Sequence, residues 1–284
     1  MTRTPTFAHR DAPPQRGPRP VQRLDTTCEG VWIIQAICGI EVLPATLLLR
    51  PWVSEGGIPY GHPGLAALRA AGVLLEDETV HPTVEGWIET LAAADIELCV
   101  SVRRGEEHLR AVIARRGQDH AVAMRCGDNV TIYGIQVGDI GALAARMLPL
   151  CGPNTPPAPV DPIRVRSDML LDGLADMIRG DKRPFKRLGL SAQQREIMMM
   201  ATNHPPMETS FAVIVHDETG DHVGLVAAAI TDTEQGRVVA GPVRSQDGTW
   251  FTQIVPGTPG AAARAVAAVV SSMGVTWHEH ARHK

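Results

Sequence analysis

The chain has 284 residues, of which 44% are hydrophobic and 20% charged, a composition typical of a globular protein and not of a disordered one. The formal net charge is −4, but residues 1–24 hold five arginines and one aspartate, so the remainder carries about −8. An acidic body argues against a nucleic-acid-binding groove, whose phosphate contacts need lysine and arginine.

The amino terminus is too polar to be a signal peptide, and no stretch approaches the roughly 18 apolar residues of a membrane span. The five cysteines are an odd number without a CxxC pair, which favours a reducing compartment. We therefore expect a cytoplasmic protein without membrane insertion. The cysteines are Cys28, Cys38, Cys99, Cys126 and Cys151.

The first half of the chain begins with residues 1–23, whose Pro, Arg and Gln content predicts a disordered basic tail. A short strand at 26–28 leads into a helix that ends before Gly39. A second helix begins after Pro63, and a third follows Pro82 with Trp87, Leu91 and Ala94 on one face. Four strands and a last helix follow. Their expected ranges are 96–104, 109–116, 120–126, 130–136 and, for the helix, 140–148.

The second half begins after Pro153 to Pro162, the strongest structure-breaking stretch in the chain and the expected linker. Ile163–Arg166 reads as a short strand, and Ser167 as the cap of a helix to Ile178. Ser191 and Gln194 form a capping-box pattern for the next helix. Four strands and a helix follow, at 210–217, 222–231, 236–243, 249–255 and 260–272. The last residues, 275–284, read as a polar, unanchored, His-rich tail.

The order of these elements repeats. Residues 236–273 read as strand, turn, strand, Pro-Gly break and Ala-rich helix, and residues 118–148 have the same layout at lower fidelity, with a Gly break. The hairpins before them, 96–115 and 210–231, also correspond. A repeat of this length decides the architecture, and short turns between strands mean antiparallel neighbours. We predict an α+β fold with a central, mostly antiparallel sheet and two related halves, 24–152 and 163–274, that arose by internal duplication.

No catalytic, phosphate-binding or metal-binding signature accompanies this layout. The glycines between 56 and 64 match neither GxGxxG nor GxxxxGK[ST], and no GxSxG is present. His278, His280 and His283 lie close in sequence but without partners on a fixed element, so neither a metal site nor a cofactor is expected. Cysteines in apolar stretches favour buried thiols over nucleophiles.

Two stretches are candidates for contact with a partner. Met198, Met199 and Met200 are consecutive on a helix and cannot all face one way, which fits either a helix buried on two sides or an adaptable contact surface. The hairpin tip Arg103 to Arg110 carries three arginines, two glutamates and a histidine, which fits either a solvated turn or a polar docking loop.

Several short motifs, in order along the chain, resemble the EspG family of mycobacterial type VII (ESX) secretion. Near the amino terminus these are Glu29-Gly30-Val31-Trp32, Gln35 and Leu49-Arg50-Pro51. Before the last helix they are Gly236-Arg237-Val238, Asp247-Gly248-Thr249-Trp250 and Val255-Pro256-Gly257-Thr258. The resemblance spans about residues 24–274. The basic tail, the His-rich end and a short 104–109 loop depart from it.

The resemblance implies a central sheet flanked by helical bundles, and a cytosolic chaperone that covers the apolar tip of the PPE subunit in PE–PPE heterodimers. Burying such a tip prevents aggregation. By position, the resemblance places partner contacts on the hairpin and on the second-half helix, where charge reversal at Glu106-Glu107, or Met198→Asp, should weaken binding without unfolding. The residues are Arg103, Arg104, Glu106, Glu107, His108, Gln194, Ile197, Met198 and Met200.

The sequence therefore predicts a non-enzymatic secretion chaperone for PE–PPE pairs, with no nucleic acid as partner. Two alternatives stay open. One is an enzyme with an unrecognised Cys or His centre, which would need an accessible thiol. The other is a scaffold that self-associates through its sheet, and a homodimer of the free chaperone is also open.

Overall fold

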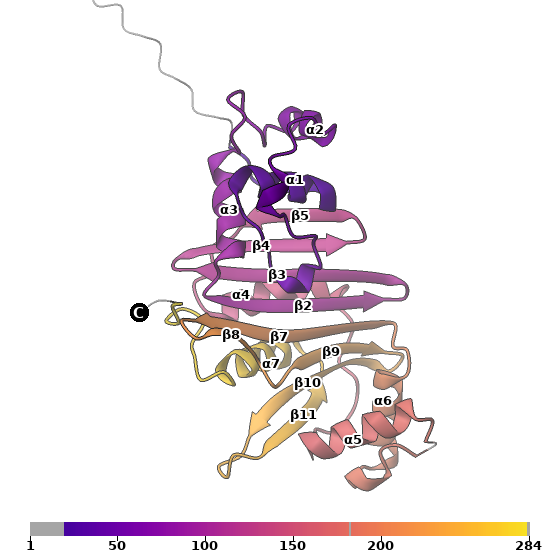
Figure 1. The fold of residues 1–284 in the computed structure, drawn as a ribbon. Coiled ribbons are helices and arrows are strands. Elements are labelled where there is room, and N and C mark those ends of the chain that lie inside the picture. Colours follow the sequence, from indigo (N-terminus) through magenta and orange to yellow (C-terminus); the bar gives the residue numbers. More distant parts are fainter. Residues whose placement is uncertain (1–19, 182, 283–284) are drawn as a thin grey trace, which may run out of the picture.

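A computed structural model describes residues 20–181 and 183–282. The expected disordered tail falls largely on residues 1–19, outside the described residues. The described residues form one 11-stranded antiparallel sheet with helices on both faces (Figure 1). The strands are β1 (Leu24–Thr27), β2 (Ile96–Arg104), β3 (Glu107–Arg116), β4 (Asp119–Cys126), β5 (Asn129–Gly134), β6 (Ile163–Arg166), β7 (Met207–Asp217), β8 (Gly220–Val223), β9 (Ala228–Thr233), β10 (Gly236–Arg244) and β11 (Trp250–Pro256).

In residues 20–181 and 183–282, seven α-helices connect and cover these strands. They are α1 (Cys28–Cys38), α2 (Gly64–Ala70), α3 (Pro82–Ala92), α4 (Ile140–Met147), α5 (Ser167–Ile178), α6 (Ala192–Thr202) and α7 (Pro259–Ser271). Short 3₁₀ turns lie at Ala45–Leu47, Ser54–Gly56, Leu148–Cys151 and Lys186–Leu188. The predicted fold class and nearly every predicted element are confirmed.

The strand order is the same in the two halves. Along the sheet it runs β1-β5-β4-β3-β2 in one half and β6-β11-β10-β9-β7 in the other, and β2 and β7 pair antiparallel at the centre. The register at this seam places Ile96 opposite Val215 and Arg103 opposite Glu208. The order agrees with the repeat read from the sequence. An origin by duplication stays a prediction.

The two faces of the sheet are covered differently. On one face, α4 and α7 pack together across the centre, over a core that draws on strands of both halves. On the other face, α1–α3 cover one end of the sheet and α5–α6 the other, each over a separate apolar cluster. Figure 1 shows these two helical groups at opposite ends of the row of strands. The middle of this second face, around β2 and β7, lies between them.

Local sequence explains the helix ends. The αL residue Gly39 (φ 69°) ends α1 as expected, and the capping box of α6 is formed, with Gln194 N 3.2 Å from Ser191 Oγ and Ser191 N 3.0 Å from Gln194 Oε1. Ser167 is not the cap of α5: the helix starts at Ser167 itself, and its hydroxyl lies 3.0 Å from that of Thr252.

The predicted face of α3 is confirmed. Leu91 and Ala94 are buried, and Trp87 is half-buried and packs against the same apolar cluster. Val84 and Ile88 are also buried on this helix, which packs on β4 and β3.

The segment between the halves is not a free linker. Ala158 and Val160 are buried in the α5–α6 cluster, and Pro157 bridges to Arg237 of β10. Gly236 has φ 124°, and a Cβ there would lie 2.7 Å from the carbonyl oxygen of Pro156, so this close approach of two backbones needs glycine. The prolines exclude residues 153–162 from helices, as predicted, but part of this segment is still buried in the core.

The His-rich end is anchored as well, in contrast to the prediction. Trp277 is 2% exposed and belongs to the core beneath α7. Residues 275–282 contact both halves of the molecule. Lys284 and His283 lie outside the described residues.

Candidate functional site

An apolar groove of about 540 Å³ opens on the second face of the sheet, between helices α5 and α6 and strands β7, β9, β10 and β11. Three large apolar side chains on its walls are strongly exposed: Leu171 (65%), Ile178 (84%) and Leu225 (98%). Its floor is formed by small or apolar strand residues, including Ala229 and Ala240. Apolar side chains gathered at a concave surface are typical of a site that binds another apolar group.

The groove depends on a break in one strand. The sequence predicts a single strand at 222–231, but the structure divides it into β8, which pairs with Ile214–Asp217, and β9, which pairs with Met207–Phe211. At the break, Gly224 N donates to the Val213 carbonyl (2.8 Å), and Leu225 points away from the protein core. The equivalent strand β3 is continuous over ten residues.

Helix α6 supplies the other wall. Ile197 and Met198 are buried, at 0% and 4% exposure, and both line the groove, whereas Met199 and Met200 are half-buried on other sides of the helix. Met198→Asp would therefore bury a charge, which is costly, so we expect this substitution to destabilise the fold as well as to weaken binding. Leu225 is the position where a charge can be added without that cost.

The β2–β3 hairpin lies beside the mouth of the groove. Arg103 is paired across the seam with Glu208, a groove residue, and directly opposed residues of antiparallel strands share a face. Arg104 lies on the opposite face, where its guanidinium is 3.8 Å from Met207 Sδ. Glu106 and Glu107 are exposed at the tip. Of the predicted hairpin residues, Arg103 is thus the one beside the groove on its face.

His108 occupies the same face as Arg103, its partner in the β2–β3 ladder. Its Nε2 lies 2.7 Å from the Ser101 hydroxyl. Burial, followed by the positive charges of Arg110 and Arg103, lowers the pKa of His108, so the ring is neutral at pH 7. The middle of this face therefore carries polar side chains, with Arg103 opposite Glu208 and His108 beside Ser101.

The predicted helix residues have different surroundings. Gln194 is engaged by the capping box, and its Nε2 is 3.5 Å from the Asp161 carbonyl, so its contacts hold the helix in place. Ile197 and Met198 meet the groove, and Met200 does not line it. The structure brings two of the four together at one surface.

Leu171, Ile178 and Leu225 were missed by the sequence analysis. Leu171 and Ile178 lie on α5 outside its buried stripe of Leu170 and Gly173, a pattern that could have been found by looking for apolar residues on the polar side of an amphipathic helix. Leu225 had no such signal, because it lies within an apolar run that reads as strand.

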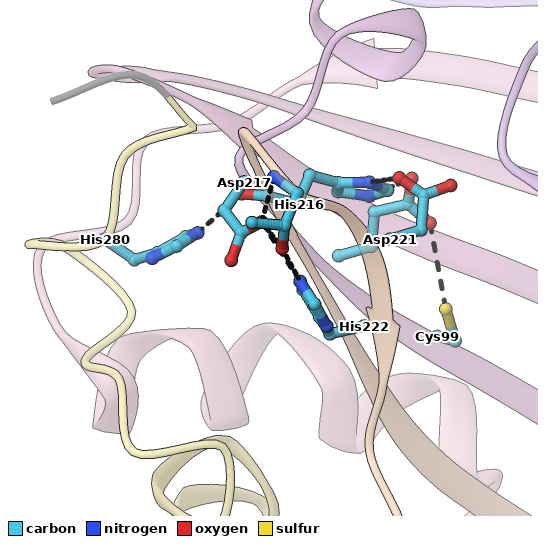
Figure 2. Close-up of polar contacts among 8 residues, drawn as sticks. Cys99, His216, Asp217, Asp221, His222 and His280 are labelled. Atoms are coloured by element: carbon cyan, nitrogen blue, oxygen red, sulfur yellow. Dashed lines mark hydrogen bonds and ion pairs between the residues drawn. The ribbon is translucent and has the colours of Figure 1, made fainter.

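A second set of polar groups lies at the other end of the β2–β7 seam (Figure 2). His216 Nε2 is 3.1 Å from Glu97 Oε1, and its Nδ1 is 2.6 Å from Asp221 Oδ1. The hydrogen bond to Glu97, with that to Asp221, raises the pKa of His216. Two carboxylates favour the protonated ring, which forms a stable ion pair with them. A protonated imidazole is a poor general base.

Three of the five thiols are not activated. Cys99 Sγ is 3.9 Å from Glu97 Oε2, and burial raises the pKa of Cys99 to about 12. Burial also raises the pKa of Cys38 to about 12 and that of Cys151 to about 11. A nucleophilic cysteine needs the opposite shift, so the geometry of these three thiols does not favour the enzyme alternative.

In residues 20–181 and 183–282, no cluster of three or more His, Cys, Asp or Glu side chains has an arrangement that could bind a metal ion. Within the same ranges, no helix combines the length and apolar character that a membrane crossing requires.

Comparison with known sequences gave consistent matches. A model of the EspG family matches residues 27–268. The ESX-2 secretion-associated protein EspG2 of Mycobacterium tuberculosis is 30% identical over 240 residues, which cover 78% of this chain and 85% of that protein. The ESX-5 secretion-associated protein EspG5 of Mycobacterium marinum is 25% identical over 289 residues, covering 89% and 95%.

Comparison with solved structures gave the same fold. The Mycobacterium tuberculosis type VII secretion system chaperone EspG5, solved in complex with a PE25–PPE41 dimer, superposes with a TM-score of 0.81 at 21% identity. The match covers 92% of this chain and all of that one.

Proposed function

Because this chain belongs to the EspG family, we propose that it is a cytoplasmic secretion chaperone that binds a PE–PPE heterodimer through the apolar tip of its PPE subunit and keeps the pair soluble for an ESX secretion system. No reaction and no cofactor are part of this proposal. Support comes from the secretion-associated relatives and from the EspG5 chain of the same fold, which was solved with a PE25–PPE41 dimer.

The groove is the observation that carries the proposal. An apolar tip at the end of a helical protein needs a concave apolar surface, and Leu171, Ile178 and Leu225 offer exposed side chains around one. Burial of apolar area stabilises a complex by about 25 cal/mol per Å² before the costs of association. A tip that covers these three side chains would remove its own apolar surface and theirs from water together.

The hairpin supplies the polar rim. Arg103 lies beside the groove on the same face, and Glu106 and Glu107 extend beyond it at the tip. Charges at the rim of an interface set the association rate and partner choice more than the affinity. We therefore assign recognition to the hairpin and most of the binding free energy to the groove.

The test is co-expression with candidate PE–PPE pairs from the same genome, followed by size-exclusion chromatography with light scattering. We expect one pair to be retained in a ternary complex and to be insoluble alone. Leu225→Asp should lower retention of that pair at least tenfold. Val42→Asp, at a residue that is 63% exposed in the other half, is the matched control and should bind normally.

Two outcomes would contradict parts of the proposal. If no pair is retained, the chaperone function is wrong, and a mass that rises with concentration would favour the self-associating scaffold. If a pair is retained equally by Leu225→Asp, the function holds and the groove is the wrong surface. Charge reversal at Glu106 and Glu107 should then be tested, because a loss there would move the site to the hairpin.

A further inference from the structure

The last described residues, 275–282, form a strap that lies across the seam between β2 and β7. Trp277 anchors it in the core at 2% exposure. From there the backbone runs past the start of β2 and the end of β7, where the two halves of the sheet meet. The strap follows α7 in the chain, so it continues from the second half and contacts the first half.

On the first half, the strap is held by a buried ion pair. The Arg282 backbone N donates to Asp95 Oδ1 (2.8 Å), while Asp95 Oδ2 accepts from Gly117 N (2.7 Å) and lies 3.6 Å from Arg115 Nη1. The Arg115 side chain, only 2% exposed, also donates to the His280 carbonyl.

On the second half, the strap is held through β7. His280 Nε2 donates to the His216 carbonyl (2.7 Å), and the His216 N–H donates to the Asp95 carbonyl (2.9 Å). Figure 2 shows His280 reaching from the strap toward His216 and Asp217 of β7. Asp95 and His216 are thus joined to each other and to the strap, and its release would remove contacts from both sides of the seam.

One contact of the strap fixes the protonation state of a buried histidine. The indole Nε1–H of Trp277 can only donate, and it lies 3.2 Å from His120 Nε2. The other ring nitrogen of His120, Nδ1, is 3.0 Å from the Gln118 carbonyl and must donate to it. His120 Nε2 is therefore the unprotonated acceptor, and the docked strap requires a neutral imidazole.

The surroundings of His120 oppose its protonation further. The ring is 6% exposed. The charged and titratable groups that act on it are Arg115 from β3, Asp119 from β4 and His278 from the strap, whose ring centroid is 6.1 Å away. Burial has the largest effect and lowers the pKa of His120, and the hydrogen bond to the Gln118 carbonyl opposes it. Arg115 and His278 lower the pKa further, and Asp119 has the smallest effect, in the opposite direction.

We propose that residues 275–282 are a pH-responsive strap that fastens the two halves together while His120 is neutral and is released when His120 is protonated. A proton on Nε2 removes the acceptor of Trp277 and places a cation beside Arg115. His216 does not counteract this, because the strap contacts only its backbone and its ring is held by Glu97 and Asp221. The proposal does not depend on the identity of any client.

The direction of the pH dependence follows from the lowered pKa. Docking of the strap stabilises the neutral form of His120. The contribution of His120 to the free energy of docking is therefore fully present above the pKa of a free histidine, about 6.5. It is lost as the pH falls through the lower pKa of the docked state. Each unit by which docking lowers the pKa gives at most about a tenfold loss in the docking equilibrium.

The experiment is ¹⁹F NMR of the full chain labelled with 5-fluorotryptophan, titrated from pH 8 to pH 5. The chain has five tryptophans, and Trp277→Phe assigns the resonance of Trp277. We expect this resonance alone to move to the position of an exposed tryptophan, with a midpoint below that of free histidine, while the other four are unchanged. Amide exchange of residues 275–282 should rise over the same range.

His120→Gln is the decisive variant, because its side-chain oxygen can accept from Trp277 and does not titrate. In it the strap should stay docked throughout the titration. His222→Gln, at an exposed histidine that pairs with Asp217, is the control and should release like the wild type. A Trp277 resonance that is constant to pH 5, one that moves only with all the others, or the same transition in a folded His120→Gln would each overturn the proposal.

Discussion

The two helical flanks on the open face of the sheet occupy equivalent positions, yet one is filled and the other is hollow. Among the described residues, 22 buried apolar residues make up the cluster under α1–α3, against 11 under α5–α6. The groove of about 540 Å³ lies in the second flank. The difference shows that halves with the same strand order can carry a fully packed flank in one case and a flank with an open groove in the other.

The cause of the difference is local. In the first half, β3 is continuous and the turn at Ala45–Leu47 packs over it, so α3 rests on a complete surface. In the second half, the break between β8 and β9 removes four residues from the ladder and leaves Leu225 exposed. Helix α6 then buries only Ile197 and Met198, where α3 buries a full stripe.

The largest expected effect on the free energy of unfolding concerns a buried ion pair in the second half. Arg237 Nε lies 2.6 Å from Asp232 Oδ1, and its Nη2 donates to the carbonyls of Cys151 (2.7 Å) and Pro153 (3.0 Å). Arg237→Met leaves a buried carboxylate unpaired, and we expect a loss of about 3–5 kcal/mol in the free energy of unfolding. Urea denaturation measures it.

The control for Arg237→Met is an exposed pair in the same half. Arg179→Met breaks the pair with Asp176, whose cost should be at most about 1 kcal/mol. Equal costs for the two variants would mean that the second half does not depend on its buried ion pair.

A matched pair of core substitutions compares the flanks directly. Ile88 on α3 and Ile197 on α6 are both fully buried. Ile88→Ala should lower the free energy of unfolding by about 2–5 kcal/mol, because the filled flank keeps the cavity. Ile197→Ala should cost less, since its side chain borders a groove already open to water. A larger loss for Ile197→Ala in urea denaturation would show that the second flank is closed in solution.

The smallest expected effect on stability comes from filling the groove. Ala229 lies on its floor in β9, and Ala229→Ile adds a β-branched side chain where strand propensity favours one. We expect the free energy of unfolding to change by no more than about 1 kcal/mol. Retention of the PE–PPE pair in the co-expression assay should fall at least tenfold. Normal retention would show that the client does not enter the groove.

Much of the fold could be predicted because it rests on local signals. The turn at Gly127-Asp128-Asn129, the capping box at Ser191 and the αL glycine Gly39 each fix their own neighbourhood, and the structure has all of them. The repeat then predicted which elements correspond. The predictions that were wrong, at Ser167 and at the strand over 222–231, concern alternative local structures between which only tertiary packing decides.

The site was less accessible to sequence. The hairpin and α6 were placed near a partner surface by resemblance. In the structure Ile197 and Met198 line one groove, and Arg103 lies opposite the groove residue Glu208. Arg104 faces away, and Gln194 caps a helix. Leu225, the most exposed apolar residue of the groove, looks in sequence like any strand residue. The exposure of a side chain depends on whether residues distant in the sequence pack against it. The local sequence does not show whether such contacts form.

By itself, the sequence determined the element order, the antiparallel sheet, the two corresponding halves and the resemblance to EspG proteins, because turn chemistry, hydrophobic periodicity and short motifs act over a few residues. The tertiary structure alone decided where the groove opens, that the segment between the halves is packed, and that the His-rich end is fastened across the seam. Each of these joins residues far apart in the chain, such as Arg282 and Asp95. Their free energy comes from burial and buried hydrogen bonds that exist only when the whole sheet has formed.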